Sequence, residues 1–219
     1  MAVSIELWRV GIAALASWAC GYSKGRGKLD PVYVKWTEGR DAKGSWAHYS
    51  SCADLGHGIA QRCGVRERWV NRETDDVNGP WKPVLNVGLL GVPSEAVTAA
   101  YHSPGLGDIW ILSNAHWPAG SDYHVAVCLG PNPAVHGEWL TANYGAGGMS
   151  ASEKPGAKIS SKPLATDGAG IIYGSKRVSR VITVPNLVGR STGKPDFSGP
   201  DFDADFTGEV KDALEAANG

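Results

Sequence analysis

The sequence predicts an α+β fold in which N-terminal helices pack on an antiparallel sheet, and two observations lead to it. The first 64 residues hold two stretches with helical character, whereas short β-rich runs bounded by Gly, Pro and Asn begin near residue 107. Helices first and strands second is the order typical of α+β proteins. With 219 residues, 42% of them hydrophobic, the chain can bury a core, and we assign residues 1–184 to a single domain.

The first predicted helix spans residues 3–20, where apolar residues recur at helical spacing. Its apolar face is formed by Ile5, Trp8, Ile12, Leu15 and Ala19. Glu6 and Arg9 lie beside the most apolar stretch and no basic segment precedes it, so we expect no signal peptide. No apolar run approaches the roughly 20 residues of a membrane span, and we expect a soluble protein.

A second helix is predicted from about Cys52 to Cys63. Ser50 and Ser51 can cap its first turn, and Gly64 follows its last residue in the manner of a C′ glycine. A short helix is also expected at residues 94–101, where a Pro-Ser pair begins a helix-compatible stretch.

The later half of the chain carries the predicted strands and a distinct C-terminal extension. The β-rich runs are residues 108–112, 124–129, 138–142, 171–173 and 178–184. Residues 185–219 lose apolar periodicity and gather acidic residues among Gly, Pro and Phe. We therefore expect an acidic, extended tail there.

Charge and cysteine usage exclude several classes of protein. The net charge of −1 and the absence of a basic cluster argue against nucleic-acid binding. The four cysteines form neither a disulfide framework nor paired C-x-x-C motifs, so we expect free thiols, no metal and no cofactor. Three of them, Cys20, Cys63 and Cys128, have the surroundings of small buried hydrophobic residues.

The remaining cysteine, Cys52, has the position of a nucleophile. A helix N-terminus lowers the pKa of a thiol, and a general base must then come from another part of the fold. His124 opens the β-rich run His-Val-Ala-Val-Cys-Leu-Gly, which would hold an imidazole rigidly. Asp108 begins another strand, where a carboxylate often accepts hydrogen bonds from nearby backbone N–H groups, and we leave it out of the catalytic set.

At these residues the sequence resembles the NlpC-like and CHAP amidases and peptidases. Ser51-Cys52-Ala53-Asp54-Leu55 is similar to their cysteine motif, Gly107-Asp108-Ile109-Trp110 to their Gly-Asp strand, and His124-Val125-Ala126-Val127 to their histidine strand. The resemblance covers about residues 45–148. It implies a papain-like fold with the nucleophile helix packed on the sheet, and a thiol mechanism in which Cys52 attacks an amide carbonyl and His124 moves the proton.

The resemblance leaves the third catalytic residue open between two candidates. Asn143, in Asn143-Tyr144-Gly145, is similar to the CHAP pattern, whereas His136 matches the NlpC-like histidine by spacing. We favour Asn143 because His136 lies where a turn is expected. The backbone N–H of Cys52 would supply part of an oxyanion hole, and a side-chain donor, for which Tyr33 and Tyr49 are candidates, stays unassigned.

The function that follows is cleavage of an amide bond in bacterial peptidoglycan by an endopeptidase or amidase. Without an export signal, we expect a phage lysin or virion-associated enzyme that stays in the host cytoplasm until release or travels with the virion. The acidic tail could dock to virion or delivery proteins. Two alternatives remain, a catalytically idle structural virion or assembly component and an intracellular thiol protease or deamidase.

Overall fold

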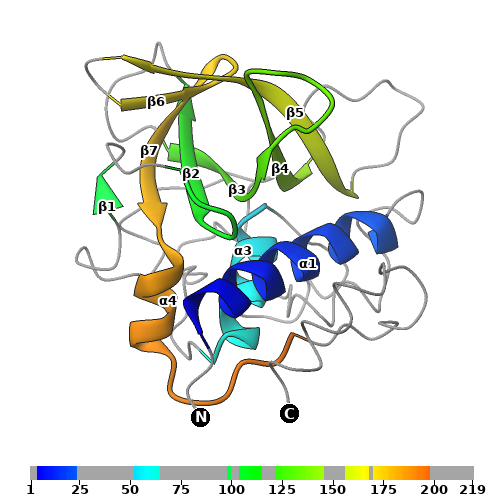
Figure 1. Cartoon of the computed structure of the whole chain (residues 1–219), viewed down its shortest axis with the longest axis vertical. Helices are drawn as coiled ribbons and strands as arrows, with labels where there is room; N and C mark the ends of the chain where they lie inside the picture. The colour runs from blue at the N-terminus through cyan, green and yellow to red at the C-terminus, as the bar shows by residue number, and fades with distance from the viewer. Residues whose placement is uncertain are drawn as a thin grey trace, which may run out of the picture.

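The computed structural model describes residues 4–23, 52–64, 98–99, 104–114, 122–145, 156–167 and 170–197. The helices are α1 (Ile5–Ser23), α3 (Cys52–Arg62) and α4 (Val184–Arg190). The strands are β1 (Thr98–Ala99), β2 (Ile109–Asn114), β3 (Asp122–Pro131), β4 (Glu138–Gly145), β5 (Gly156–Asp167), β6 (Gly170–Tyr173) and β7 (Lys176–Ile182). Figure 1 shows the strands in the upper part of the view and the three helices below them.

Six of the strands form a closed antiparallel barrel. The order is β7-β2-β3-β4-β5-β6, and β6 pairs again with β7, so the sheet returns to its first strand. Strand β1 pairs with the C-terminal part of β7, at Arg180 and Val181. The predicted papain-like α+β fold, with N-terminal helices packed on an antiparallel sheet, is therefore wrong, because the described residues form a closed barrel of antiparallel strands with few helices.

Strand β5 is the reason that the sequence did not reveal the barrel. Its residues 156–167 combine Gly, Lys and Ser with short apolar pieces and Pro163, and such a polar run predicts no strand. In the structure β5 pairs along eight residues of β4 and then with β6. Without β5 the sheet would have free edges, whereas with it the hydrogen bonding continues around the barrel.

The barrel has a packed interior that is separate from the core beneath the helices. The interior cluster draws side chains from all six strands, with Trp110, Leu112 and Tyr173 among the buried ones. Trp110 packs edge-on against Tyr173, with ring centroids 5.6 Å apart. This interior is filled by side chains, as is usual for small barrels.

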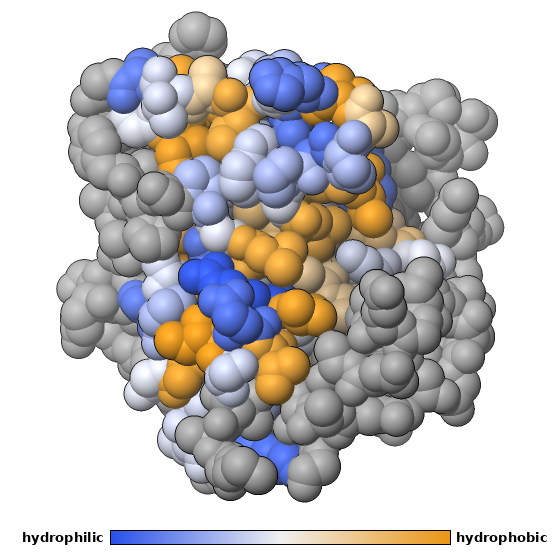
Figure 2. Space-filling view, viewed as in Figure 1, coloured by the Kyte–Doolittle hydropathy of each residue, from blue (hydrophilic) through white to orange (hydrophobic). Residues whose placement is uncertain are grey.

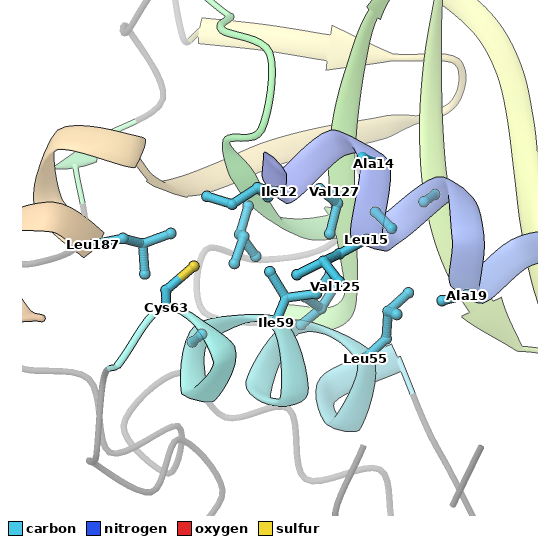
Figure 3. Close-up of a cluster of buried hydrophobic side chains, with 14 of the residues drawn as sticks. Ile12, Ala14, Leu15, Ala19, Leu55, Ile59, Cys63, Val125, Val127 and Leu187 are labelled. Carbon is cyan, nitrogen blue, oxygen red and sulfur yellow. The ribbon is translucent and has the colours of Figure 1, made fainter. Parts of the chain in front are cut away.

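The second cluster lies between the outer face of the barrel and the helices. Alternate residues of β3, Val125 and Val127, face α1 and α3 across this cluster. Figure 3 shows Leu55 and Ile59 of α3 pointing into it. The face drawn in Figure 2 shows apolar atoms, in orange, mixed with hydrophilic ones. Within the described residues, no helix combines the length and the apolar character that crossing a membrane requires.

Helices α3 and α4 are tied together near the end of α3. Gly64 adopts φ +78° just beyond the helix, the conformation for which glycine is favoured. The carbonyl of Gly64 accepts hydrogen bonds from the backbone N–H and the hydroxyl of Thr192. Arg62 bonds Asp196 through both its carbonyl and its guanidinium. The C-terminal end of α3 is therefore fixed against the segment that follows α4.

The start of the predicted tail packs on the body of the protein. Helix α4 begins at Val184, and its cap is Thr183, whose hydroxyl accepts a hydrogen bond from the N–H of Asn186. Phe197 is fully buried and meets Trp8 edge-on at 5.8 Å. Residues 198–219 of that predicted tail lie outside the described residues. Of the short helix predicted at residues 94–101, Thr98–Ala99 forms strand β1 instead.

Candidate active site

His124 lies near the beginning of β3, with its imidazole on the interior face of the barrel. It pairs with Leu112 of β2, and residues directly opposite in an antiparallel pair share a face. Because Leu112 belongs to the interior cluster, the imidazole faces the interior as well. Burial lowers the pKa of His124, a hydrogen bond with the Asn143 side chain opposes that shift, and the positive charge of Lys158 adds to it.

Asn143, near the end of β4, is the side chain that meets this imidazole. It pairs with Ala126, another residue of the interior face. Its Nδ2 donates to Ser160 Oγ at 3.1 Å, to Thr141 Oγ1 at 3.4 Å and to the carbonyl of Lys158 at 3.4 Å. With the nitrogen committed to these acceptors, Oδ1 is the atom left to accept from His124.

His136 lies far along the hairpin from this pair. It belongs to the turn that joins β3 and β4, and its side chain is exposed. His124 is near the opposite end of β3, and Asn143 is near the opposite end of β4. Of the two predicted candidates for the third residue, Asn143 is the one that contacts His124.

Cys52 is the first residue of α3, and its side chain is half-buried against the helix-side cluster. The other end of α3 is fixed near α4, which follows directly on β7 where Ile182 pairs with Ile109. The helix rises by about 15 Å between Cys52 and Arg62, so Cys52 lies that far from the end fixed near α4. Figure 3 shows Leu55 toward the Ala19 end of α1, and the thiol of Cys20 is hydrogen-bonded by the backbone of Asn143. Cys52 therefore lies toward the barrel end that carries His124.

The thiol helix and the imidazole nevertheless belong to different sides of the sheet. Helix α3 packs on β3 and β4 over the outer face, where Val125 and Val127 point. His124 faces the interior, on the other side of the same strand. Since His124 is the third residue of β3, the imidazole can reach the thiol only around the beginning of that strand.

The other three cysteines have thiols that stay protonated at neutral pH. Burial raises the pKa of Cys20 and of Cys128 to about 12, and it raises the pKa of Cys63 further. All three are buried, whereas Cys52 is partly accessible. Among the four cysteines, Cys52 is therefore the one whose thiol a substrate can reach.

Asp108 of the Gly-Asp motif organises the fold at the opposite end of β2. Its carboxylate accepts hydrogen bonds from the N–H of Gly105 at 2.9 Å and of Val184 at 3.1 Å, and it lies 3.5 Å from the guanidinium of Arg9. These contacts connect the turn before β2 with α1 and the start of α4. The preceding Gly107 has φ +80°, a conformation that other residues rarely adopt.

Several residues around His124 and Asn143 were missed by the sequence reasoning. Thr141, Ser160 and Lys158 bond Asn143, and Tyr173 extends this polar group into the barrel. The one signal available was the spacing of two between Thr141 and Asn143, which puts both on one face of a strand. Tyr33 and Tyr49, the candidates for the unassigned side-chain oxyanion donor, lie outside the described residues. In the part of the chain that the structure describes, no group of three or more His, Cys, Asp or Glu could hold a metal.

Comparison with known proteins finds no matching family model, no matching curated sequence and no matching solved structure. The motif resemblance to NlpC-like and CHAP enzymes therefore remains an expectation from the sequence.

Proposed function

We propose that the protein is a thiol-dependent hydrolase that cleaves an amide bond of bacterial peptidoglycan, with Cys52 as nucleophile, His124 as general base and Asn143 as the residue that orients the base. The observation that carries the proposal is the hydrogen-bonded His124–Asn143 pair at the barrel end toward which α3 begins with Cys52. A nucleophile, a base and an orienting group are the three parts that such chemistry needs.

The reaction proceeds in two halves. His124 accepts the proton of the Cys52 thiol, and the thiolate attacks the amide carbon to form a C–S bond. The tetrahedral oxyanion is stabilised by the backbone N–H of Cys52, because N–H groups at the start of a helix point outward along its axis. The C–N bond then breaks as His124 returns the proton to the leaving amine. Water, deprotonated by His124, attacks the thioester, and the C–S bond breaks to release the acid and restore the thiol.

One property of His124 and one of Cys52 support a thiol mechanism with His124 as the base. Its pKa is lowered by burial, so the imidazole is neutral near pH 7 and can accept a proton. The N-terminus of α3 favours a negative charge at Cys52, because the first N–H groups of a helix carry partial positive charge. Peptidoglycan as substrate rests on the cysteine, Gly-Asp and histidine motifs, and a lysin or virion-associated enzyme is the form of delivery that we favour.

The test is digestion of purified peptidoglycan from several wall types, followed by mass spectrometry of the soluble fragments. We expect the wild type to release fragments with new amino termini, and we expect release to fall below detection in Cys52→Ala and about 100-fold or more in His124→Ala. Cys63→Ala is the matched control, because it removes a buried thiol beyond the other end of α3, away from the proposed site. Equal release by the wild type and Cys52→Ala would refute the thiol mechanism.

One observation favours a second candidate, a catalytically idle structural component of a virion. Helix α3 covers the outer face of β3 while His124 faces the interior, which leaves the thiol and the base on different sides of the strand. This candidate predicts no fragment release from any wall type. An intracellular thiol protease or deamidase, the third possibility, would instead give Cys52-dependent turnover of protein substrates with no muropeptide products.

A further inference from the structure

We propose that Thr141 and Tyr173 are positioning residues that, through Asn143, fix which ring nitrogen of His124 carries the proton. The side chains of Asn143, Thr141 and Tyr173, together with the backbone carbonyl of Ser160, form a hydrogen-bond chain that we call the relay. This inference rests on the proposed function, since it concerns the base of that reaction, but the relay can be tested without turnover.

The far end of the relay fixes its direction. Tyr173 Oη lies 2.8 Å from the carbonyl of Ser160 and 3.2 Å from the carbonyl of Trp139. Carbonyl oxygens only accept hydrogen bonds, so the phenol must donate its single proton to them. Tyr173 can therefore only accept from Thr141, whose Oγ1 donates across 3.1 Å.

The same reasoning passes from Thr141 to Asn143. Because the proton of Thr141 is used for Tyr173, its Oγ1 can only accept from Asn143 Nδ2, which lies 3.4 Å away. The carbonyl of Lys158, also 3.4 Å from Nδ2, favours the same orientation, since a rotated amide would set two oxygens against each other. Asn143 Oδ1 must then face His124.

An acceptor facing the imidazole decides its tautomer. The ring nitrogen that faces Oδ1 must carry a proton, so in the neutral ring the other nitrogen keeps its lone pair. That second nitrogen is the one available to accept a proton from a thiol. A neutral imidazole with the opposite tautomer would clash with the relay and would be unable to act as the base.

Burial makes the relay rigid. Thr141 is fully buried, Tyr173 is 5% exposed and Asn143 is 9% exposed, so water cannot easily replace the lost partners if one group turns. Burial also raises the pKa of Tyr173, which keeps the phenol protonated as the relay requires. Among the described residues, the charged or titratable groups near the relay include Lys158, Cys20, Cys128 and Glu138.

The experiment is nitrogen-15 NMR of histidine-labelled full-length protein, which reports the tautomer and the pKa of His124 across a pH titration. We expect one tautomer in the wild type. Thr141→Val, which keeps the shape and removes the hydroxyl, should give a mixture of tautomers and a lower pKa of His124. Thr141→Ser should restore both, and Tyr173→Phe should act in the direction of Thr141→Val.

Val178→Ala is the matched control, because it opens space in the same barrel interior without removing a polar group, and it should leave the tautomer unchanged. Under the proposed function, Thr141→Val should also lower kcat by about tenfold at constant KM. A tautomer and pKa unchanged in both Thr141→Val and Tyr173→Phe would overturn the relay. If the variants change the tautomer but the wild type hydrolyses no substrate, the relay is supported and the proposed function is refuted.

Discussion

Two polar assemblies stand at opposite ends of the β2–β3 pair, and they are built for different purposes. At one end Asp108 accepts from Arg9 and from the N–H groups of Gly105 and Val184, and we call this set the Asp108 junction. At the other end the relay terminates on His124. The junction joins a carboxylate to a guanidinium and two backbone N–H groups, whereas the relay ends on an imidazole, a group that can take up and release a proton.

The difference shows how a motif residue and a site residue can be told apart. Asp108 is fully buried and its donors come from three separate segments of the chain, so its carboxylate holds the fold together. Asn143 also has several partners, but they hold its Oδ1 toward the half-buried imidazole of His124. A polar group whose bonds all serve the scaffold is structural, whereas one that directs an atom at a titratable group is a candidate for chemistry.

The largest expected effect comes from breaking the Asp108 junction. Asp108→Ala leaves Arg9 without its buried partner and leaves the backbone N–H groups of Gly105 and Val184 without their acceptor. We therefore expect a loss of about 3–5 kcal/mol in the free energy of unfolding. Urea denaturation measures this loss. Arg177→Ala, which breaks the more exposed pair with Asp167, is the control and should cost less than about 1 kcal/mol. Similar losses in the two variants would contradict the structural role of the junction.

A smaller effect is expected from the packing of α1, the helix that Asp108 anchors. A Cβ at Gly11 would lie 2.5 Å from the ring of Phe197, whereas one at Gly21 would meet nothing within 4 Å. Gly11→Ala should therefore destabilise the protein by about 1–3 kcal/mol, and Gly21→Ala in the same helix should be neutral or stabilising by up to about 1 kcal/mol. Thermal unfolding of the two variants tests this, and a stable Gly11→Ala protein would mean that Phe197 does not pack there.

The smallest effect is the pH dependence contributed by His124. Its pKa in the folded state is lowered from the usual value of 6.5 by burial, so the unfolded chain binds a proton more readily. Stability is therefore full above about pH 6.5 and declines as the pH falls through the lowered pKa. His124→Gln should remove this part of the decline between pH 7.5 and pH 5, measured by urea unfolding. Asn143→Ala should steepen it, because the hydrogen bond with Asn143 favours the charged ring; an unchanged slope in both variants would contradict the assignment.

Much of the secondary structure was predictable from local patterns. The apolar spacing from Ile5 to Ala19 gave α1, the serine pair and Gly64 gave α3, and the β-rich runs gave strands β2, β3, β4, β6 and β7. The barrel was not predictable, because its closure depends on β5 and on the pairing of β6 with β7. Both pairings join residues that local patterns cannot connect. Strand β5 itself is hard to recognise, because its outward-facing Ile159 is 48% exposed and its many polar residues obscure the apolar alternation.

The candidate site divides in the same way. His124 and Asn143 were identified from motif resemblance, and the structure brings their side chains together. The face on which each residue lies depends on register, and a pattern of alternating apolar residues in His-Val-Ala-Val does not say which face meets a helix. For this reason neither the placement of α3 and His124 on different sides of β3 nor the link from Thr141 to Tyr173 was predictable from local patterns.

Closure of the barrel also has a kinetic consequence. Strands β3, β4, β5 and β6 follow one another along the chain and pair as neighbours, so their contacts are short in sequence, whereas β2 meets β7 by joining Ile109 to Ile182. Contacts between residues far apart in sequence form slowly. We therefore expect the four-strand meander, which holds His124, Asn143, Thr141 and Tyr173, to assemble before β7 closes on β2. The base and its supports would then exist early in folding, and the thiol helix would be added to them.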